Sequence, residues 1–373
     1  MNPPFDPPHD DRFSPPRRRF LTAAAIAGGA AALGLQPSIR AARAAIDRLD
    51  APHARDWEWL RGNWDVHHRR LKERLVGDTR WEEFAGRSAM WLTMGGLGTI
   101  DDNSLDLPGD AYRGLGLRVF DPGSGTWAIW WLDGRNPTRI EPAVRGGFDG
   151  DTGTFSGRNT LRGQPILMRF RWHDIHGERP WWEQAFSPDD GASWEVNWRN
   201  WFTRTSATPH PLPMRADAPT DFSFIAGRWK VWNRRLRERL VGNDDWDEFP
   251  GTLHNWPVLG GYGNVGDNVM HFPGGDVRGV SVRSYDAGTG QWLSWWIDNR
   301  DPSRLEPPVK GRFTGGGDNR LLIGDDTLRG QPIKTRVIWS HISADSARWE
   351  QACSADGGQT WEVNWTSDFT RIG

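Results

Sequence analysis

The chain has 373 residues and a formal net charge of −2, from 46 basic and 48 acidic side chains. This near balance argues against a nucleic-acid-binding protein, which needs a concentrated basic face. The single cysteine, Cys353, excludes an intrachain disulfide. Tryptophan is unusually frequent, with 25 copies between Trp57 and Trp365. A chain with so many large aromatic rings, each with an N–H group, has to pack or use them in a specific way.

Residues 1–44 are predicted to lie outside the folded part of the protein. The sequence Arg17-Arg18-Arg19-Phe20-Leu21 places arginines directly before an apolar run, and Ala42-Arg43-Ala44 follows as a cleavage candidate. This order resembles a twin-arginine export signal. The apolar run is shorter than the ~20 residues of a membrane-spanning helix. We therefore expect a periplasmic or secreted protein with no membrane span after the signal is cleaved.

The rest of the chain contains the same sequence twice. Residues 64–148 align with residues 229–313 at an offset of 165 (229 − 64 = 165). After a two-residue insertion, residues 161–204 align with residues 328–371 at an offset of 167 (328 − 161 = 167). A residue that is kept in both copies is needed by the fold, or by a site that exists twice. The two copies therefore serve as an internal comparison.

The predicted elements of each copy are short strands of alternating polarity, separated by turns rich in Gly, Asp and Pro. This spacing is typical of a β-sandwich or β-barrel. A meander of about ten strands closes most naturally into a barrel, because closure removes the exposed edges. The expected fold is all-β, with two tandem antiparallel barrels in residues 56–204 and 221–373. A linker rich in Pro, Ala and Thr, residues 205–220, joins them.

Two patterns in the sequence resemble known barrel families. Phe224-Ile225-Ala226-Gly227-Arg228-Trp229, with Leu60-Arg61-Gly62-Asn63-Trp64 in the first copy, resembles the opening of calycin-type barrels. The strand count and turn spacing resemble the ten-stranded nitrobindin-like barrels. The combined pattern of Arg-Arg-Leu-x-Glu-Arg-Leu, Trp-x-Glu-Phe, Trp-Trp-x-Asp-x-Arg and Trp-Glu-x-Asn-Trp resembles an uncharacterised bacterial family, domain of unknown function 1579. The resemblance implies a calycin-like barrel for each copy and implies no particular activity.

Tryptophans kept in both copies on predicted strands are the main ligand-binding candidates, because flat apolar rings stack on sugars and aromatic molecules. Each Trp-Trp pair is followed by an Asp-x-Arg motif, whose arginine either orients a polar ligand or pairs with the aspartate. The plainer alternative is that the rings fill the barrel interiors. The ligand-binding candidates are Trp130, Trp131, Arg135, Trp172, Trp198, Trp295, Trp296, Arg300, Trp339 and Trp365.

Carboxylates kept in both copies are the catalytic candidates if the protein is an enzyme, since paired acids serve general acid and base chemistry. These candidates are Asp133, Asp298, Glu183 and Glu350. The sequence leaves open whether any reaction is catalysed.

Histidine argues against a metal or haem site in each copy, because no histidine is kept in both. Nitrobindin-like barrels bind haem through a histidine, and this chain departs from that pattern. No cofactor or metal is predicted, and a single haem held by His173, His176 or His341 is the lesser alternative.

The sequence favours an exported tandem barrel that binds a carbohydrate or an aromatic metabolite in cavities lined by tryptophan. The first alternative is a carboxylate-dependent hydrolase, isomerase or lyase on the same scaffold. The second is a structural or interaction protein, in which the tryptophans serve packing alone.

Overall fold

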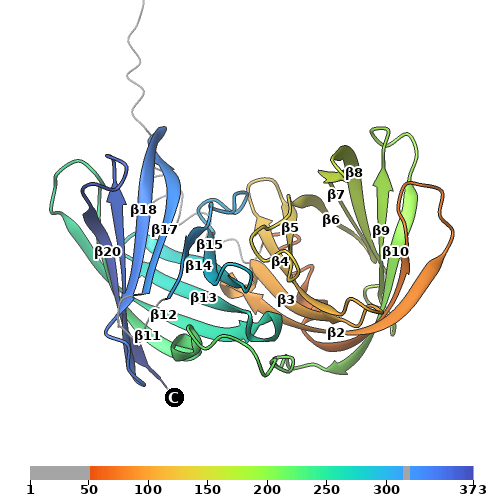
Figure 1. Ribbon diagram of the computed structural model, residues 1–373, viewed down its shortest axis with the longest axis horizontal. Helices are drawn as coiled ribbons and strands as arrows, with labels where there is room; N and C mark the ends of the chain where they lie inside the picture. The colour runs from red at the N-terminus through yellow and green to blue at the C-terminus, as the bar shows by residue number, and fades with distance from the viewer. Residues whose placement is uncertain (1–50, 314–319, 373) are drawn as a thin grey trace, which may run out of the picture. The chain divides into compact units, whose positions relative to one another are not determined.

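The computed structural model describes residues 51–313 and 320–372 (Figure 1). The predicted export signal at residues 1–44 lies outside the described residues. The described residues belong to one compact unit and form two closed antiparallel barrels of ten strands each. The prediction of a tandem all-β barrel protein is thus confirmed.

In the first barrel each strand pairs with its neighbour in sequence, and the last strand closes on the first. Trp64 of the first strand, for example, lies opposite Ser88 on one side and Arg204 on the other. The strands are β1 (Gly62–Leu71), β2 (Trp81–Thr93), β3 (Gly98–Leu105), β4 (Tyr112–Asp121), β5 (Thr126–Asp133), β6 (Val144–Asp149), β7 (Thr152–Leu161), β8 (Gln164–His173), β9 (Trp181–Ser187) and β10 (Glu195–Ser206).

The second barrel repeats this meander and closes in the same way. Its strands are β11 (Gly227–Leu236), β12 (Trp246–Val258), β13 (Gly263–Phe272), β14 (Gly275–Asp286), β15 (Gln291–Asp298), β16 (Val309–Gly311), β17 (Arg320–Leu328), β18 (Gln331–Ser340), β19 (Ser346–Ser354) and β20 (Glu362–Arg371). Four short 3₁₀ helices complete the elements: η1 (Glu58–Leu60), η2 (Met94–Gly96), η3 (Ser223–Ile225) and η4 (Leu259–Gly261).

No helix of the described residues is long and apolar enough to cross a membrane.

Aromatic packing forms the core at one end of each barrel. Trp57, just before η1, is fully buried, and its ring centroid lies 5.4 Å from that of Trp172 and 5.6 Å from that of Phe155. Phe222 takes the place of Trp57 in the second barrel (222 − 57 = 165) and meets Trp292 at 4.8 Å. Edge-on and tilted ring contacts of this kind add to the stabilisation from buried area. This end of each barrel is therefore filled by side chains.

The two barrels share a reciprocal contact. The backbone N–H of Met94 donates to Oδ1 of Asp267 at 2.9 Å, and that of Leu259 donates to Oδ1 of Asp102 at 3.0 Å. Both pairs of equivalent residues differ by 165 (259 − 94 and 267 − 102). Trp91 and Trp256, also equivalent, pack with their ring centroids 5.4 Å apart. The same patch of each barrel thus contacts its counterpart, as in a symmetric dimer.

Candidate functional site

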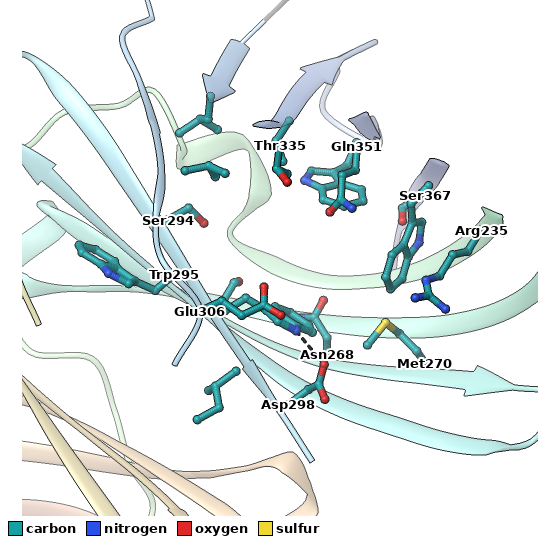
Figure 2. A pocket seen from close by; sticks show the side chains of 18 of the residues that line it. Arg235, Asn268, Met270, Ser294, Trp295, Asp298, Glu306, Thr335, Gln351 and Ser367 are labelled. Carbon is teal, nitrogen blue, oxygen red and sulfur yellow. Dashed lines mark hydrogen bonds between the residues drawn. The ribbon is translucent and has the colours of Figure 1, made fainter. Parts of the chain in front are cut away.

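A cavity of about 310 Å³ lies in the second barrel (Figure 2). Its wall is built from side chains on the inner faces of strands that are far apart in sequence, together with the segment that follows β15. Side chains alternate between the two faces of a strand, so Ser294, Trp296 and Asp298 of β15 reach the cavity together. The main polar and aromatic lining residues are Arg235, Asn268, Trp296, Asp298, Glu306, Thr335, Trp349, Gln351 and Trp365.

Smaller side chains make room for this cavity where the first barrel has larger ones. Four lining positions carry Ser294, Leu322, Thr335 and Val337. Their equivalents in the first barrel, at offsets of 165 and 167, are Ile129, Phe155, Met168 and Phe170. Ile129, Phe155 and Met168 are buried in the core of the first barrel. At these four positions the second barrel carries the smaller side chain, whereas Leu253 and Ser281, which also line the cavity, are larger than their equivalents Ser88 and Gly116.

Asp298 contacts both a tryptophan that lines the cavity and an arginine with which it forms an ion pair. Its carboxylate accepts hydrogen bonds from Arg300 at 2.6 and 3.0 Å, and from Nε1 of Trp296 at 2.9 Å. Burial alone would raise the pKa of Asp298, but the hydrogen bonds and charge of Arg300 hold that pKa below its usual value. Asp298 is therefore ionised near neutral pH and fixes both neighbours in place. Within the described residues its oxygens are already used, which favours a bracing role over proton transfer.

Glu306 brings a second, less stabilised carboxylate to the cavity. Its backbone N–H donates to the carbonyl oxygen of Trp296 at 2.9 Å, which holds the segment after β15 against the barrel. The equivalent Glu141 of the first barrel accepts a hydrogen bond from Nδ2 of Asn159 at 2.6 Å. In the second barrel Asp326 replaces that asparagine (326 − 159 = 167).

The exchange of an amide for a carboxylate changes the electrostatics around Glu306. Removal from water, and then the charges of Asp298 and Asp326, raise the pKa of Glu306 to about 7. A carboxyl group with such a pKa is partly protonated at neutral pH and is able to donate as well as accept a hydrogen bond. The cavity of the second barrel thus contains a carboxyl group that gains or loses a proton near neutral pH.

The structure brings most of the predicted second-barrel residues to this one cavity. Trp295, Trp296, Arg300, Trp339, Trp365 and Asp298 all line it. Trp339 is almost fully buried and also packs on Phe369 at 5.3 Å, so much of its ring belongs to the core. Glu350 is separate from the cavity lining: its neighbours Trp349 and Gln351 line the cavity, whereas Glu350 lies 3.8 Å from Arg336.

The first-barrel candidates divide between the two faces of the sheet. Trp131 lies across from Gly114, where any Cβ would meet its ring at 2.2 Å, and is therefore on the inner face. Trp198 packs on Trp182 at 6.1 Å, also inside. Trp130 alternates with Trp131 and lies in the buried apolar cluster that includes Leu259 of the second barrel.

Ion pairs hold the remaining charged candidates of the first barrel. Arg135 bonds Asp133 at 2.6 Å and lies over the ring of Tyr112 at 3.6 Å. Glu183 bonds Arg199 at 3.4 Å. In the described part of the chain no group of three or more His, Cys, Asp and Glu side chains is arranged to hold a metal ion. His173, a haem candidate, stacks on Trp181 with the ring centroids 4.0 Å apart.

Arg235 and Glu306 are among the cavity residues that are absent from the sequence-based candidates. Both have equivalents in the first copy, Arg70 and Glu141. Many charged and polar residues are kept in both copies, so repetition alone does not distinguish these two. The stronger signal is a difference between the copies beside each residue. Asp326 replaces Asn159 next to Glu306, and Asp247 replaces Glu82 next to Arg235.

Comparisons with known proteins show likeness at the level of remote structure alone. No family model matches the chain, and no curated protein matches it. A protein of unknown function from the DUF3598 family of Nostoc punctiforme is 10% identical, with a TM-score of 0.20, over 86% of this chain and 99% of that chain. A mutant of transferrin binding protein B from Haemophilus parasuis is 6% identical, with a TM-score of 0.19, over 84% and 76% of the two chains.

A mutant of AofleA from Arthrobotrys oligospora is 8% identical, with a TM-score of 0.16, over 77% of this chain and 86% of that chain. These scores are too low to carry an argument about function. The resemblance to domain of unknown function 1579 stays a prediction from the sequence patterns. The function has to be inferred from the cavity itself.

Proposed function

We propose that the protein binds a small organic molecule in the cavity of the second barrel. The observation that carries this proposal is the lining: tryptophan faces stand beside arginine, carboxylate and amide groups in one cavity of about 310 Å³. Ligand sites of this kind are mostly apolar, with a few polar groups that fix orientation. The volume is at the small end of the usual range of roughly 300–1,000 Å³, which favours a ligand with one or two rings.

The comparison between the barrels supports this assignment. If the tryptophans served packing alone, both interiors would be expected to be filled in the same way. Instead Thr335 and Val337 stand in the second barrel where Met168 and Phe170 stand in the first, and the smaller pair lines the cavity. An internal space lined by polar and aromatic groups lowers the packing density of the ligand-free barrel. Ligand binding offers a physical reason for such a space.

The proposal is tested by restoring the first-barrel residues. The double variant Thr335→Met with Val337→Phe fills the cavity with side chains that the same fold already accommodates. Ligand-observed NMR with a library of aromatic and sugar-like fragments should detect binders of the wild-type protein that the filled variant no longer binds. A filled variant that retains every binder of the wild type would contradict the proposal.

The reverse exchange, Met168→Thr with Phe170→Val, is the matched control. It alters the equivalent positions of the first barrel and should leave the wild-type binders of the second barrel in place. Loss of binding in this control would mean that the second-barrel cavity is not the site.

We also propose that the protein works after export, on the strength of the arginine motif before residue 20. Replacing Arg18 and Arg19 by lysine should retain the precursor in the cytoplasm, as followed by cell fractionation. Unchanged export of this variant would refute a twin-arginine route.

A further inference from the structure

Arg235 is a cation that faces the cavity without a protein counter-ion. No hydrogen bond or ion pair joins its guanidinium to any of the described residues. Its contacts are the faces of two aromatic rings, Trp365 at 5.2 Å and Phe272 at 5.7 Å from the guanidinium carbon. Removal from water, followed by the charges of Arg300 and Arg239, lowers the pKa of Arg235 to about 10, although the more weakly acting charges of Asp298 and Asp247 oppose this shift. The side chain is still cationic at neutral pH, where an unpaired charge away from water is costly.

In the first barrel a carboxylate of the protein itself neutralises the equivalent arginine. The equivalent Arg70 bonds Glu82 on the neighbouring strand, with Nη2 to Oε1 at 2.9 Å. In the second barrel the position of Glu82 is held by Asp247 (247 − 82 = 165), whose carboxylate is one methylene shorter. Asp247 bonds Arg237 instead, at 2.8 Å, and Lys72 is the equivalent of Arg237 in the first barrel. Because Asp247 replaces Glu82 and Arg237 replaces Lys72, Arg235 lacks the hydrogen-bonded carboxylate that Arg70 has.

The other charges of the cavity set the net balance at this end. Arg300 is neutralised by Asp298, whereas the guanidinium of Arg239, which also lines the cavity, has no ion pair within the described residues. Figure 2 shows Arg235 and Glu306 toward opposite sides of the cavity, with Asn268 and Met270 between them. Arg235 thus lies against the ring of Trp365, and the charges of Asp298 and Asp326 act on Glu306.

We infer that Arg235 is the anchor of an anion subsite, and that the ligand of the second barrel is a small aromatic carboxylic acid. This inference rests on the proposed function, because it specifies the ligand of the same cavity. A guanidinium fork matches a carboxylate in a bidentate arrangement. Trp365 and Trp296 then supply flat apolar faces for the ring of the ligand. The carboxylate takes the role that Glu82 has in the first barrel.

The test compares acids with their neutral counterparts on the full chain. The probes are indole-3-acetate and 4-hydroxyphenylacetate, paired with the alcohols indole-3-ethanol and 4-hydroxyphenylethanol, and affinity is measured by isothermal titration calorimetry. The wild type should bind each acid at least about tenfold more tightly than its alcohol, as expected for hydrogen bonds to a charged group. Arg235→Gln should remove that preference, because it should weaken binding of the acids much more than binding of the alcohols. Arg70→Gln, the matched first-barrel variant, should change neither.

A second variant tests the same subsite without deleting the arginine. The pair Asp247→Glu with Arg237→Lys recreates the first-barrel arrangement and gives Arg235 an internal carboxylate. This variant should lose the preference for acids, because the new glutamate competes with the ligand carboxylate for Arg235. The variant should fold, because the first barrel already contains the same arrangement of side chains.

The outcomes separate the two proposals. Equal affinity of the wild type for acids and alcohols, or an acid preference that survives in Arg235→Gln, would overturn the anion subsite while cavity binding stands. If no probe binds the wild type, the subsite for aromatic acids fails, while cavity binding is decided by the fragment library. If the filled variant Thr335→Met with Val337→Phe binds the probes as well as the wild type, cavity binding fails and the subsite fails with it.

Discussion

Nε1 of Trp296 donates a hydrogen bond to Oδ2 of Asp298 at 2.9 Å, and the same carboxylate accepts two hydrogen bonds from the guanidinium of Arg300 and one from its backbone N–H. Asp298 therefore fixes the position of both the Trp296 ring, which lines the cavity, and the Arg300 guanidinium. In the first barrel the equivalent Asp133 also bonds Arg135, but that arginine additionally bonds Asp110 and lies over Tyr112. In the second barrel Asp298 thus contacts both the tryptophan and the arginine, whereas in the first barrel Asp133, Asp110 and Tyr112 share the contacts to Arg135.

Asp298→Asn should destabilise the second barrel, because Arg300 loses the charge that holds it. Breaking a buried pair costs about 3–5 kcal/mol, but the Arg300 side chain is 29% exposed, so solvent screening reduces the expected loss to about 1–3 kcal/mol. Urea denaturation, followed by hydrogen exchange of the β15 amides, measures the effect.

The pH dependence has a definite sign for this residue. The pKa of Asp298 is lowered in the folded protein, so its contribution is present above the ordinary carboxyl pKa and is lost as pH falls through the lower folded value. The variant should therefore differ most from the wild type at neutral pH and least in acid. Asp133→Asn, at a more exposed pair, is the control with the smaller expected loss, and an equal loss in both variants would contradict the bracing role of Asp298.

Trp292 and Trp296 lie on the same face of β15 and should respond differently to truncation. Trp292 is 1% exposed and packs on Phe222, so Trp292→Ala should cost about 3–5 kcal/mol in the free energy of unfolding. Trp296 is only half-buried, since its ring faces the cavity. Trp296→Ala should cost less stability and abolish retention of a ligand. A loss of stability in Trp296→Ala as large as in Trp292→Ala, with ligand binding intact, would support the packing-only role.

The β5 and β15 patterns show how much of the fold the sequence determines. Alternation from Trp127 to Asp133 predicts one inner and one outer face, and the observed register places Trp131 inside, against Gly114. The closure of β1 on β10 also follows from physical reasoning, because open edges are unfavourable. Strand number and tandem arrangement were predictable for these reasons.

The cavity was harder to predict, because it depends on which differences between the copies face inward. Thr335 and Met168 are visibly unequal in the sequence, but only the register of β18 shows that position to be internal. Glu350 illustrates the opposite case: it is kept in both copies, yet the inward residues of β19 are Trp349 and Gln351. Repetition identifies what the barrel needs, whereas the functional signal lies where the copies differ.

Glu306 should make the stability of the second barrel fall as pH rises through the neutral range. Its pKa is raised to about 7 in the folded protein, from an ordinary value of 4.5, so folding favours the protonated form. The resulting penalty is absent below about pH 4.5, grows as pH rises toward 7 and is constant above it. Glu306→Gln should remove this dependence in thermal melts recorded between pH 4.5 and 8.

Asp326→Asn offers a sharper test, because it restores the amide that bonds Glu141 in the first barrel at 2.6 Å. This variant should lower the pKa of Glu306 by removing a like charge and supplying an N–H donor. The pH-dependent loss of stability should still begin near pH 4.5, but it should be smaller and should end at a lower pH than in the wild type. A melting profile that is unchanged by Asp326→Asn would show that Asp326 does not control the ionisation of Glu306.

The reciprocal contact between the barrels should be asymmetric in its energetics, although its geometry is symmetric. Asp102 accepts the Leu259 N–H and also bonds Nη2 of Arg113 at 2.9 Å, with only 1% of the Asp102 side chain exposed. Asp267 accepts the Met94 N–H, and burial raises the pKa of Asp267 to about 6.

Burial raises the pKa of Asp102 as well, but the charge of Arg113 acts against this shift. Asp102→Asn should therefore lower the free energy of unfolding at pH 7, by less than the ~3–5 kcal/mol of a broken buried pair, because Arg113 loses its charged partner. Asp267→Asn should be neutral or stabilising at pH 7, since the amide oxygen still accepts the Met94 N–H and no charge has to leave water. The advantage of Asp267→Asn should disappear as pH falls from about 6 toward 4, where the wild-type carboxyl is itself protonated in the folded state. Paired urea titrations of the two variants at pH 4.5 and pH 7 measure this difference, and equal losses at pH 7 would mean that the ion pair with Arg113 adds nothing to the contact.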